Sequence, residues 1–177
     1  MFLRKHQSVI GLLYLCLMVA CSRPATGPAA QATPSPPTIK PKTSVNFVSV
    51  RISNVQVAAG GSGEATVSVE VQDGYHVNAN PATDPWLKPT EVIAQAGDGL
   101  TVGYVKYPTA IKKKFGFSDK ELSVYEGEVG VKVLLKAEKT IAKGPHKVSA
   151  KLNIQACDNE VCYAPGTLEL SIPVIVN

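Results

Sequence analysis

The stretch "KVSAKLNIQACDNEVCYAPGTLELSIPVIV", residues 147–176, decides the fold. On both sides of a polar turn, apolar residues alternate with polar ones, which is the period of a strand with one buried face. The apolar positions are Val148, Ala150, Leu152 and Ile154 before the turn, and Leu168, Leu170, Ile172, Val174 and Val176 after it. The pattern predicts a hairpin of two strands, with Cys157 and Cys162 at its tip.

The same alternation recurs upstream of this hairpin. It is clear in "ATVSVEVQ" (65–72) and "EVGVKVLL" (128–135), and weaker at 47–57, 90–96 and 100–107. Glycine-rich turn signals separate these segments, and no window carries a helical period. Roughly seven or eight short strands in about 130 residues favour an all-β, immunoglobulin-like antiparallel sandwich. Residues 108–128 break the pattern and predict a long irregular loop, which in a compact domain is usually functional.

The N-terminus has the composition of an export signal. Arg4 and Lys5 precede a short apolar run that ends at Ala20, directly before Cys21. The run is too short for a membrane-spanning helix. We expect residues 1–20 to be a lipoprotein signal peptide and Cys21 to carry the lipid; an ordinary signal with a coincidental cysteine is the alternative. Lipidation would hold the chain on the periplasmic side of a bacterial membrane. Ser22, which is not an acidic retention signal, favours the outer membrane.

After the predicted anchor the composition changes. Residues 21–44 are rich in proline and poor in residues that pack, so they predict a disordered tether ahead of a folded domain at 45–177. The formal charge of +4 falls to about +2 when Arg4 and Lys5 are removed with the signal. This weak charge, with no phosphate-binding glycine motif, argues against nucleic-acid or nucleotide partners.

The pair of cysteines has three possible roles: a structural disulfide, a metal site or a redox couple. As a structural disulfide, Cys157 and Cys162 would close a very short loop and would stabilise the fold by only about 2 kcal/mol. As a metal site, the pair lacks two ligands, because only His76 and His146 remain after cleavage. We therefore expect neither a metal nor another cofactor. As a redox couple, an accessible disulfide suits an oxidising compartment. The acidic neighbours in "CDNEVC" (157–162) disfavour a thiolate, which predicts thiols that react only when docked to a partner.

Three segments carry a family resemblance. "QACDNEVCYAPGTLELSIPV" (155–174), "DGYHVNANPATDPWLKPTEV" (73–92) and the region from "YPTAIKKKFGF" to "VYEGEV" (107–129) resemble, in the same order, the N-terminal periplasmic domain of DsbD, a transmembrane thiol:disulfide interchange reductase. The resemblance implies an immunoglobulin-like domain that receives electrons from a membrane partner and reduces disulfides in periplasmic proteins. It is an expectation about fold and chemistry.

Residue roles follow from that resemblance position by position. Cys162 would form the mixed disulfide with a client protein, and Cys157 would resolve it. A cap loop bearing a phenylalanine would shield the pair, and the residues offer both Phe115 and Phe117 for this role. His76 and Asn78, in the strand after the "DGY" turn, would line the redox site.

The resemblance also predicts partners. The expected partners are a membrane-embedded electron donor and periplasmic clients that are thioredoxin-like or otherwise carry disulfides. Because the chain ends at Asn177 without a multi-helix or thioredoxin-like domain, we expect the donor to be a separate protein, and the chain to be one component of a protein-disulfide reductase. The alternative function is a noncatalytic envelope lipoprotein that binds a ligand and uses the disulfide for local rigidity.

Overall fold

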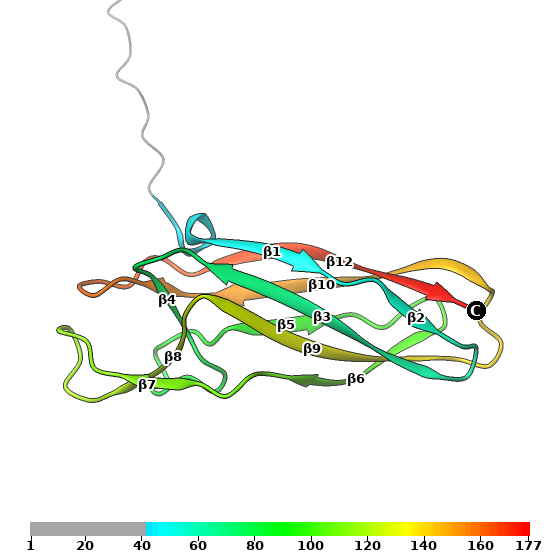
Figure 1. The fold of residues 1–177 in the computed structure, drawn as a ribbon, viewed down its shortest axis with the longest axis horizontal. Coiled ribbons are helices and arrows are strands. Elements are labelled where there is room, and N and C mark those ends of the chain that lie inside the picture. Colours follow the sequence, from blue (N-terminus) through cyan, green and yellow to red (C-terminus); the bar gives the residue numbers. More distant parts are fainter. Residues whose placement is uncertain (1–41) are drawn as a thin grey trace, which may run out of the picture. The chain divides into compact units, whose positions relative to one another are not determined.

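The computed structural model describes residues 42–177, which form the domain shown in Figure 1. The predicted signal peptide, Cys21 and the predicted tether up to residue 41 lie outside the described residues. A single 3-10 turn, η1 (Ser44–Phe47), precedes the first strand. Everything after it that has regular structure is β, which confirms the all-β fold predicted from the alternating pattern.

The first large sheet has four antiparallel strands in the order β1-β3-β9-β6. The strands are β1 (Val48–Ile52), β3 (Ser62–Val71), β9 (Glu128–Ala137) and β6 (Leu100–Lys106). Strands β3 and β9 pair over nearly their whole length, from Ser62 opposite Lys136 to Glu70 opposite Glu128. The "ATVSVEVQ" and "EVGVKVLL" stretches therefore lie side by side at the centre of this sheet.

The second large sheet has the order β2-β12-β10-β5. Its strands are β2 (Val55–Val57), β12 (Gly166–Val176), β10 (Gly144–Ile154) and β5 (Glu91–Ala94). The hairpin predicted from residues 147–176 is β10 and β12, paired from Gly144–Val176 to Ile154–Gly166. One pairing departs from the antiparallel expectation: β2 runs parallel to β12, because the chain leaves the first sheet after β1 and joins the edge of the second.

The core lies between the two large sheets. The valine-rich faces of β3 and β9 are buried, and so are alternate residues of β10 and β12. One buried face on each sheet explains the alternation in the sequence, because successive side chains in a strand point to opposite faces. The structure confirms the immunoglobulin-like sandwich.

A third, smaller sheet lies at one end of the sandwich, away from the C-terminus (Figure 1). Its order is β11-β4-β8-β7, with β11 (Ala156–Cys157), β4 (His76–Asn78), β8 (Leu122–Tyr125) and β7 (Ile111–Lys113). Residues 108–128 are thus not wholly irregular as predicted. They contain the β7–β8 hairpin. Leu122 and Val124 of β8 are buried in a small second core, which gives this strand one buried face. All three residues of β7 are exposed, so β7 shows no alternation in the sequence.

Candidate functional site

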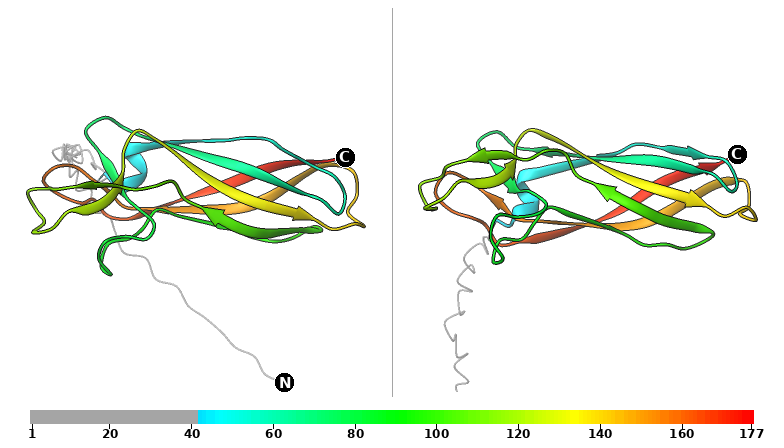
Figure 2. Two further views of the ribbon diagram at one scale, coloured as in Figure 1. Left: turned by 60° about the horizontal axis from the view of Figure 1, so that its bottom comes forward. Right: turned by 90° about the horizontal axis from the view of Figure 1, so that it is seen from below.

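The predicted cysteine pair lies where the chain leaves the β10–β12 hairpin. Residues 155–165 depart from the second sheet after Ile154, and Cys157 pairs with His76 of β4 in the third sheet. The two views of Figure 2 place this segment, in orange, at the same end of the domain as the β7–β8 hairpin. Cys157 and Cys162 face each other as an isolated bridge and form a disulfide, with Cα atoms 3.9 Å apart. This separation is shorter than that expected for facing strand residues.

A hydrogen-bonded turn holds the two cysteines together. The carboxylate of Asp158 accepts hydrogen bonds from the backbone amides of Glu160 and Val161 and from the hydroxyl of Tyr163, each at 2.8 Å. These bonds hold the pKa of Asp158 below its usual range, so the carboxylate stays charged. The hydrogen bond from the Tyr163 hydroxyl to Asp158 raises the pKa of Tyr163 to about 12, so this hydroxyl stays a donor. The turn is therefore held by contacts that do not depend on the disulfide.

The two sulfurs differ in exposure. Cys157 is fully buried, whereas Cys162 is partly exposed and lines a groove. A thiol from another protein can therefore reach the Cys162 side of the bond without reaching Cys157. The roles that the family resemblance implies for the two cysteines stay a prediction.

His76 and Asn78 are both buried on β4. The "DGY" turn ahead of them uses Gly74 with a φ of 83°, a backbone conformation that glycine adopts at little cost. Burial lowers the pKa of His76 to about 4, so the imidazole is neutral. The side-chain amide of Asn78 donates to the carbonyl of Lys88 and to the Gln155 side chain, both at 3.1 Å. Asn78 thus fixes the segment that leads into the cysteine turn.

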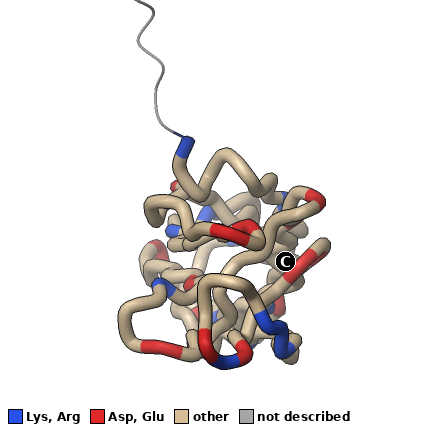
Figure 3. The backbone as a smooth tube through the Cα atoms, turned by 90° about the vertical axis from the view of Figure 1, so that its left-hand side faces the viewer, with Lys and Arg blue, Asp and Glu red and all other residues tan. Residues whose placement is uncertain are grey.

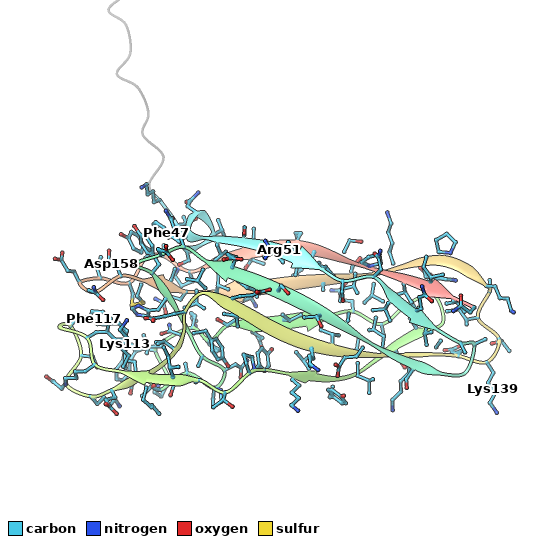
Figure 4. All side chains as sticks on the ribbon, viewed as in Figure 1. Phe47, Arg51, Lys113, Phe117, Lys139 and Asp158 are labelled. Carbon is cyan, nitrogen blue, oxygen red and sulfur yellow. A yellow bond between two sulfur atoms is a disulfide. The ribbon has the colours of Figure 1, made fainter. Side chains whose placement is uncertain are left out.

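The structure distinguishes the two candidate cap residues. Phe115 is 4% exposed, and its ring stacks on the imidazole of His76 with centroids 3.9 Å apart. Phe117 is 39% exposed and stacks on the outer side of Phe115, at 5.5 Å. Figure 4 shows Phe117 at the extreme end of the domain, on the side opposite the C-terminus. Phe115 therefore covers the interior of the site, and Phe117 faces outward.

A groove of about 560 Å³ opens beside Cys162. Its walls are mostly apolar and come from the loop after β4, from the β7–β8 hairpin and from the cysteine turn: Trp86, Leu87, Phe117, Leu122 and Val161. Trp86 is 71% exposed and Val161 is 51% exposed, which is unusual for large apolar side chains. Exposed aromatic and apolar residues of this kind are typical of surfaces that contact another protein.

An ion pair joins two walls of this groove. The ammonium of Lys120, in the β7–β8 loop, lies 2.5 Å from a carboxylate oxygen of the buried Asp84 and 5.8 Å from the centre of the Trp86 ring. Sequence reasoning did not single out Asp84, Trp86 or Lys120. The one available signal was the lone tryptophan of the chain, which lies in a proline-containing loop shortly after His76 and Asn78, the two residues predicted to line the site.

Charge around the site is mixed. Figure 3 looks onto this end of the domain and shows acidic and basic residues interspersed. In the lysine run of β7, Lys112 donates to the Ser123 hydroxyl and Lys113 pairs with Glu126. Within residues 42–177, no three metal-ligating side chains come together, and no helix is long and apolar enough to cross a membrane.

Fold and site together define a class: an immunoglobulin-like domain with one local disulfide at its loop end, beside an apolar groove and a pair of stacked phenylalanines. The model of the family "Thiol:disulfide interchange protein DsbD, N-terminal" matches residues 44–172, and the chain belongs to this family. The resemblance identified in the sequence is thereby confirmed. A comparison with curated proteins found no match.

Solved structures include two similar domains. The N-terminal periplasmic domain of ScsB from Proteus mirabilis has a TM-score of 0.50 and 13% identity, over 72% of this chain and 46% of that one. The DsbD N-terminal domain of Neisseria meningitidis, solved in its reduced form, has a TM-score of 0.42 and 20% identity, over 72% of this chain and 85% of that one. The chain thus spans less than half of the ScsB structure.

Proposed function

We propose that the domain is a periplasmic thiol:disulfide exchange module, which relays electrons from a membrane-embedded reductase to oxidised client proteins through Cys157 and Cys162. Family membership supports the chemistry. The observation that carries the proposal is the unequal exposure of the two cysteines: Cys162 is partly exposed at an apolar groove, and Cys157 is fully buried on β11 of the third sheet. A purely structural disulfide has no need of a docking groove at one of its sulfurs.

The proposed reaction balances without a cofactor. The thiolate of reduced Cys162 attacks a client disulfide, which forms a mixed disulfide and releases one client thiolate. Cys157 then attacks Cys162, which breaks the mixed disulfide and releases the second client thiolate. Two electrons have passed to the client, and the Cys157–Cys162 disulfide is restored. The same steps in reverse, with the cysteine pair of the membrane donor, reduce the domain again.

The groove supports protein clients. A client bound to the sulfur of Cys162 would contact Trp86 and Val161, which are exposed in the free domain. Burying such side chains contributes strongly to protein association. We propose thioredoxin-like proteins, or other proteins with an accessible disulfide, as the clients.

A trapping experiment tests this function. In Cys157→Ala the mixed disulfide on Cys162 cannot be resolved, so client proteins should accumulate as adducts that a reducing agent releases. Cys162→Ala is the matched control, because of the Cys157–Cys162 pair it retains only the buried cysteine. Adducts on the first variant and none on the second are the expected result. An absence of adducts on both, under mildly reducing conditions, would count against the relay.

We further propose that Cys21 is lipidated and that residues 21–44 tether the domain at a membrane, with the outer membrane favoured. Support comes from the sequence pattern, in which a short apolar run ends at Ala20 and Cys21. Fractionation of cells tests it. The native chain should sediment with outer membranes, and Cys21→Ser should be released as soluble protein; equal distribution of the two would contradict the anchor.

A further inference from the structure

His76 stands directly opposite Cys157. The two residues are partners in the antiparallel ladder between β4 and β11, so their side chains project from the same face of the third sheet. Their neighbours, Val77 and Ala156, are also paired and pack into the main core on the other face. Opposed residues in such a ladder have Cβ atoms about 4.5 to 5.5 Å apart. His76 is therefore the titratable residue that stands opposite the buried Cys157 in this ladder.

One nitrogen of this imidazole has no partner. Nε2 of His76 is buried, and no hydrogen-bond partner for it exists among the described residues. A buried polar atom without a partner is costly, and native structures contain few of them. In the oxidised domain the sulfur of Cys157 carries no hydrogen. When the disulfide is opened, Cys157 becomes a thiol and gains a proton that a neutral imidazole can accept.

The surroundings of His76 keep it neutral while the cap is closed. Phe115 covers the ring, and burial is the main cause of the low pKa. The charged groups that act on the imidazole are Glu126 and Asp158, which favour its protonated form, and Lys113, which opposes it. Displacing Phe115 would admit water and relieve the burial, so the pKa of His76 would rise toward its ordinary value.

We propose that His76 is the proton acceptor of Cys157 in the resolving step. This inference rests on the proposed exchange function. The Cys157 thiol transfers its proton to His76, and the resulting thiolate attacks Cys162 and restores the disulfide. The mixed-disulfide bond breaks, the client leaves as a thiolate, and the proton on His76 passes to that thiolate or to water. The imidazolium stabilises the adjacent Cys157 thiolate while it forms. A partner that moves Phe115 therefore also activates the resolving cysteine.

Reaction of the reduced domain with an aromatic disulfide, 5,5′-dithiobis(2-nitrobenzoate), separates the two steps. Attack by Cys162 releases the first coloured thiolate, and resolution by Cys157 releases the second. The leaving group needs no proton, so the second phase reports the deprotonation of Cys157. In His76→Phe, which keeps a stacking ring but no base, the ratio of the second rate constant to the first should fall about tenfold at neutral pH, as expected when a thiolate loses a cationic neighbour.

Two further measurements distinguish a proton acceptor from a structural residue. His76→Gln keeps polarity without a titrating group and should show the same fall, which covers the case in which the phenylalanine variant does not fold. Below the pKa of the thiol, the second rate constant of both variants should rise about tenfold per pH unit, whereas that of the native protein should rise less steeply. His146→Phe is the matched control, because His146 is only partly buried, lies on β10 rather than in the third sheet, and forms a hydrogen bond with the carbonyl of Ala142.

Each outcome decides the inference. A lower ratio in both His76 variants, with a native ratio in the control, supports it. An unchanged ratio, or an equal slowing of both phases, overturns it, because a proton acceptor for Cys157 acts on the second phase alone. If the reduced native protein releases no thiolate at all, the exchange function itself fails, and the two failures are thereby distinguished.

Discussion

Acid should destabilise the domain through a single buried histidine. The pKa of His76 is lowered from 6.5 to about 4 because burial penalises the charged ring. Between these values the unfolded chain binds a proton that the folded chain does not. The stabilisation is therefore fully present above the unfolded value and is lost as the pH falls from about 6.5 toward 4. At about 1.4 kcal/mol per pKa unit, the full loss is about 3 kcal/mol.

Urea unfolding of the native protein and of His76→Phe at pH 7 and pH 4.5 measures this loss. The free energy of unfolding of the native protein should fall between the two pH values by roughly 2 to 3 kcal/mol more than that of the variant. Carboxylates common to both proteins cancel in this difference. His146→Phe, which alters a histidine that is only partly buried, should behave like the native protein. Equal losses in the native protein and in His76→Phe would refute the reasoning.

Three other substitutions have outcomes that the contacts predict. Phe115→Ala should cost about 3 kcal/mol of unfolding free energy and speed reduction of the disulfide by dithiothreitol, whereas Phe117→Ala should cost under about 1 kcal/mol; similar costs would contradict the assigned cap. Because hydrogen bonds lower the pKa of Asp158, Asp158→Asn should destabilise the domain above about pH 4 and lose this effect as the pH falls further, as urea titrations can check. Lys120→Met leaves a buried carboxylate without its cation and should cost about 1 kcal/mol in urea, more than Lys151→Met at a surface pair; equal costs would count against the ion pair as a groove support.

The sheets could be predicted because each strand of the sandwich buries one face. Val67 to Val71 and Val129 to Leu135 show the resulting alternation directly in the sequence. The parallel pairing of β2 could not be predicted, since a three-residue edge strand has no periodicity of its own. The β7–β8 hairpin could not be recognised from the sequence for a similar reason. All of β7 is exposed, and the alternation of buried and less buried residues is confined to Leu122 and Val124 on β8.

The two cysteines of the candidate site could be predicted from the sequence, but the residues around them could be predicted only in part. Spacing and compartment single out Cys157 and Cys162, but exposure decides which sulfur a partner reaches, and exposure depends on the third sheet. The sequence could not choose between Phe115 and Phe117, because two aromatic residues two apart differ only in what they pack against. Trp86 approaches the site through a loop with no periodic pattern, so its role emerges from the tertiary structure.

The reduction potential of the Cys157–Cys162 disulfide tests the central claim most directly. It is measured by equilibrating the domain with a thiol–disulfide buffer of known potential and quantifying the free thiols. A relay must be reducible by a partner, so the account predicts a potential more oxidising than about −300 mV. A potential far below that value would identify a structural bond, contradict the relay, and favour a binding module that the disulfide merely stiffens.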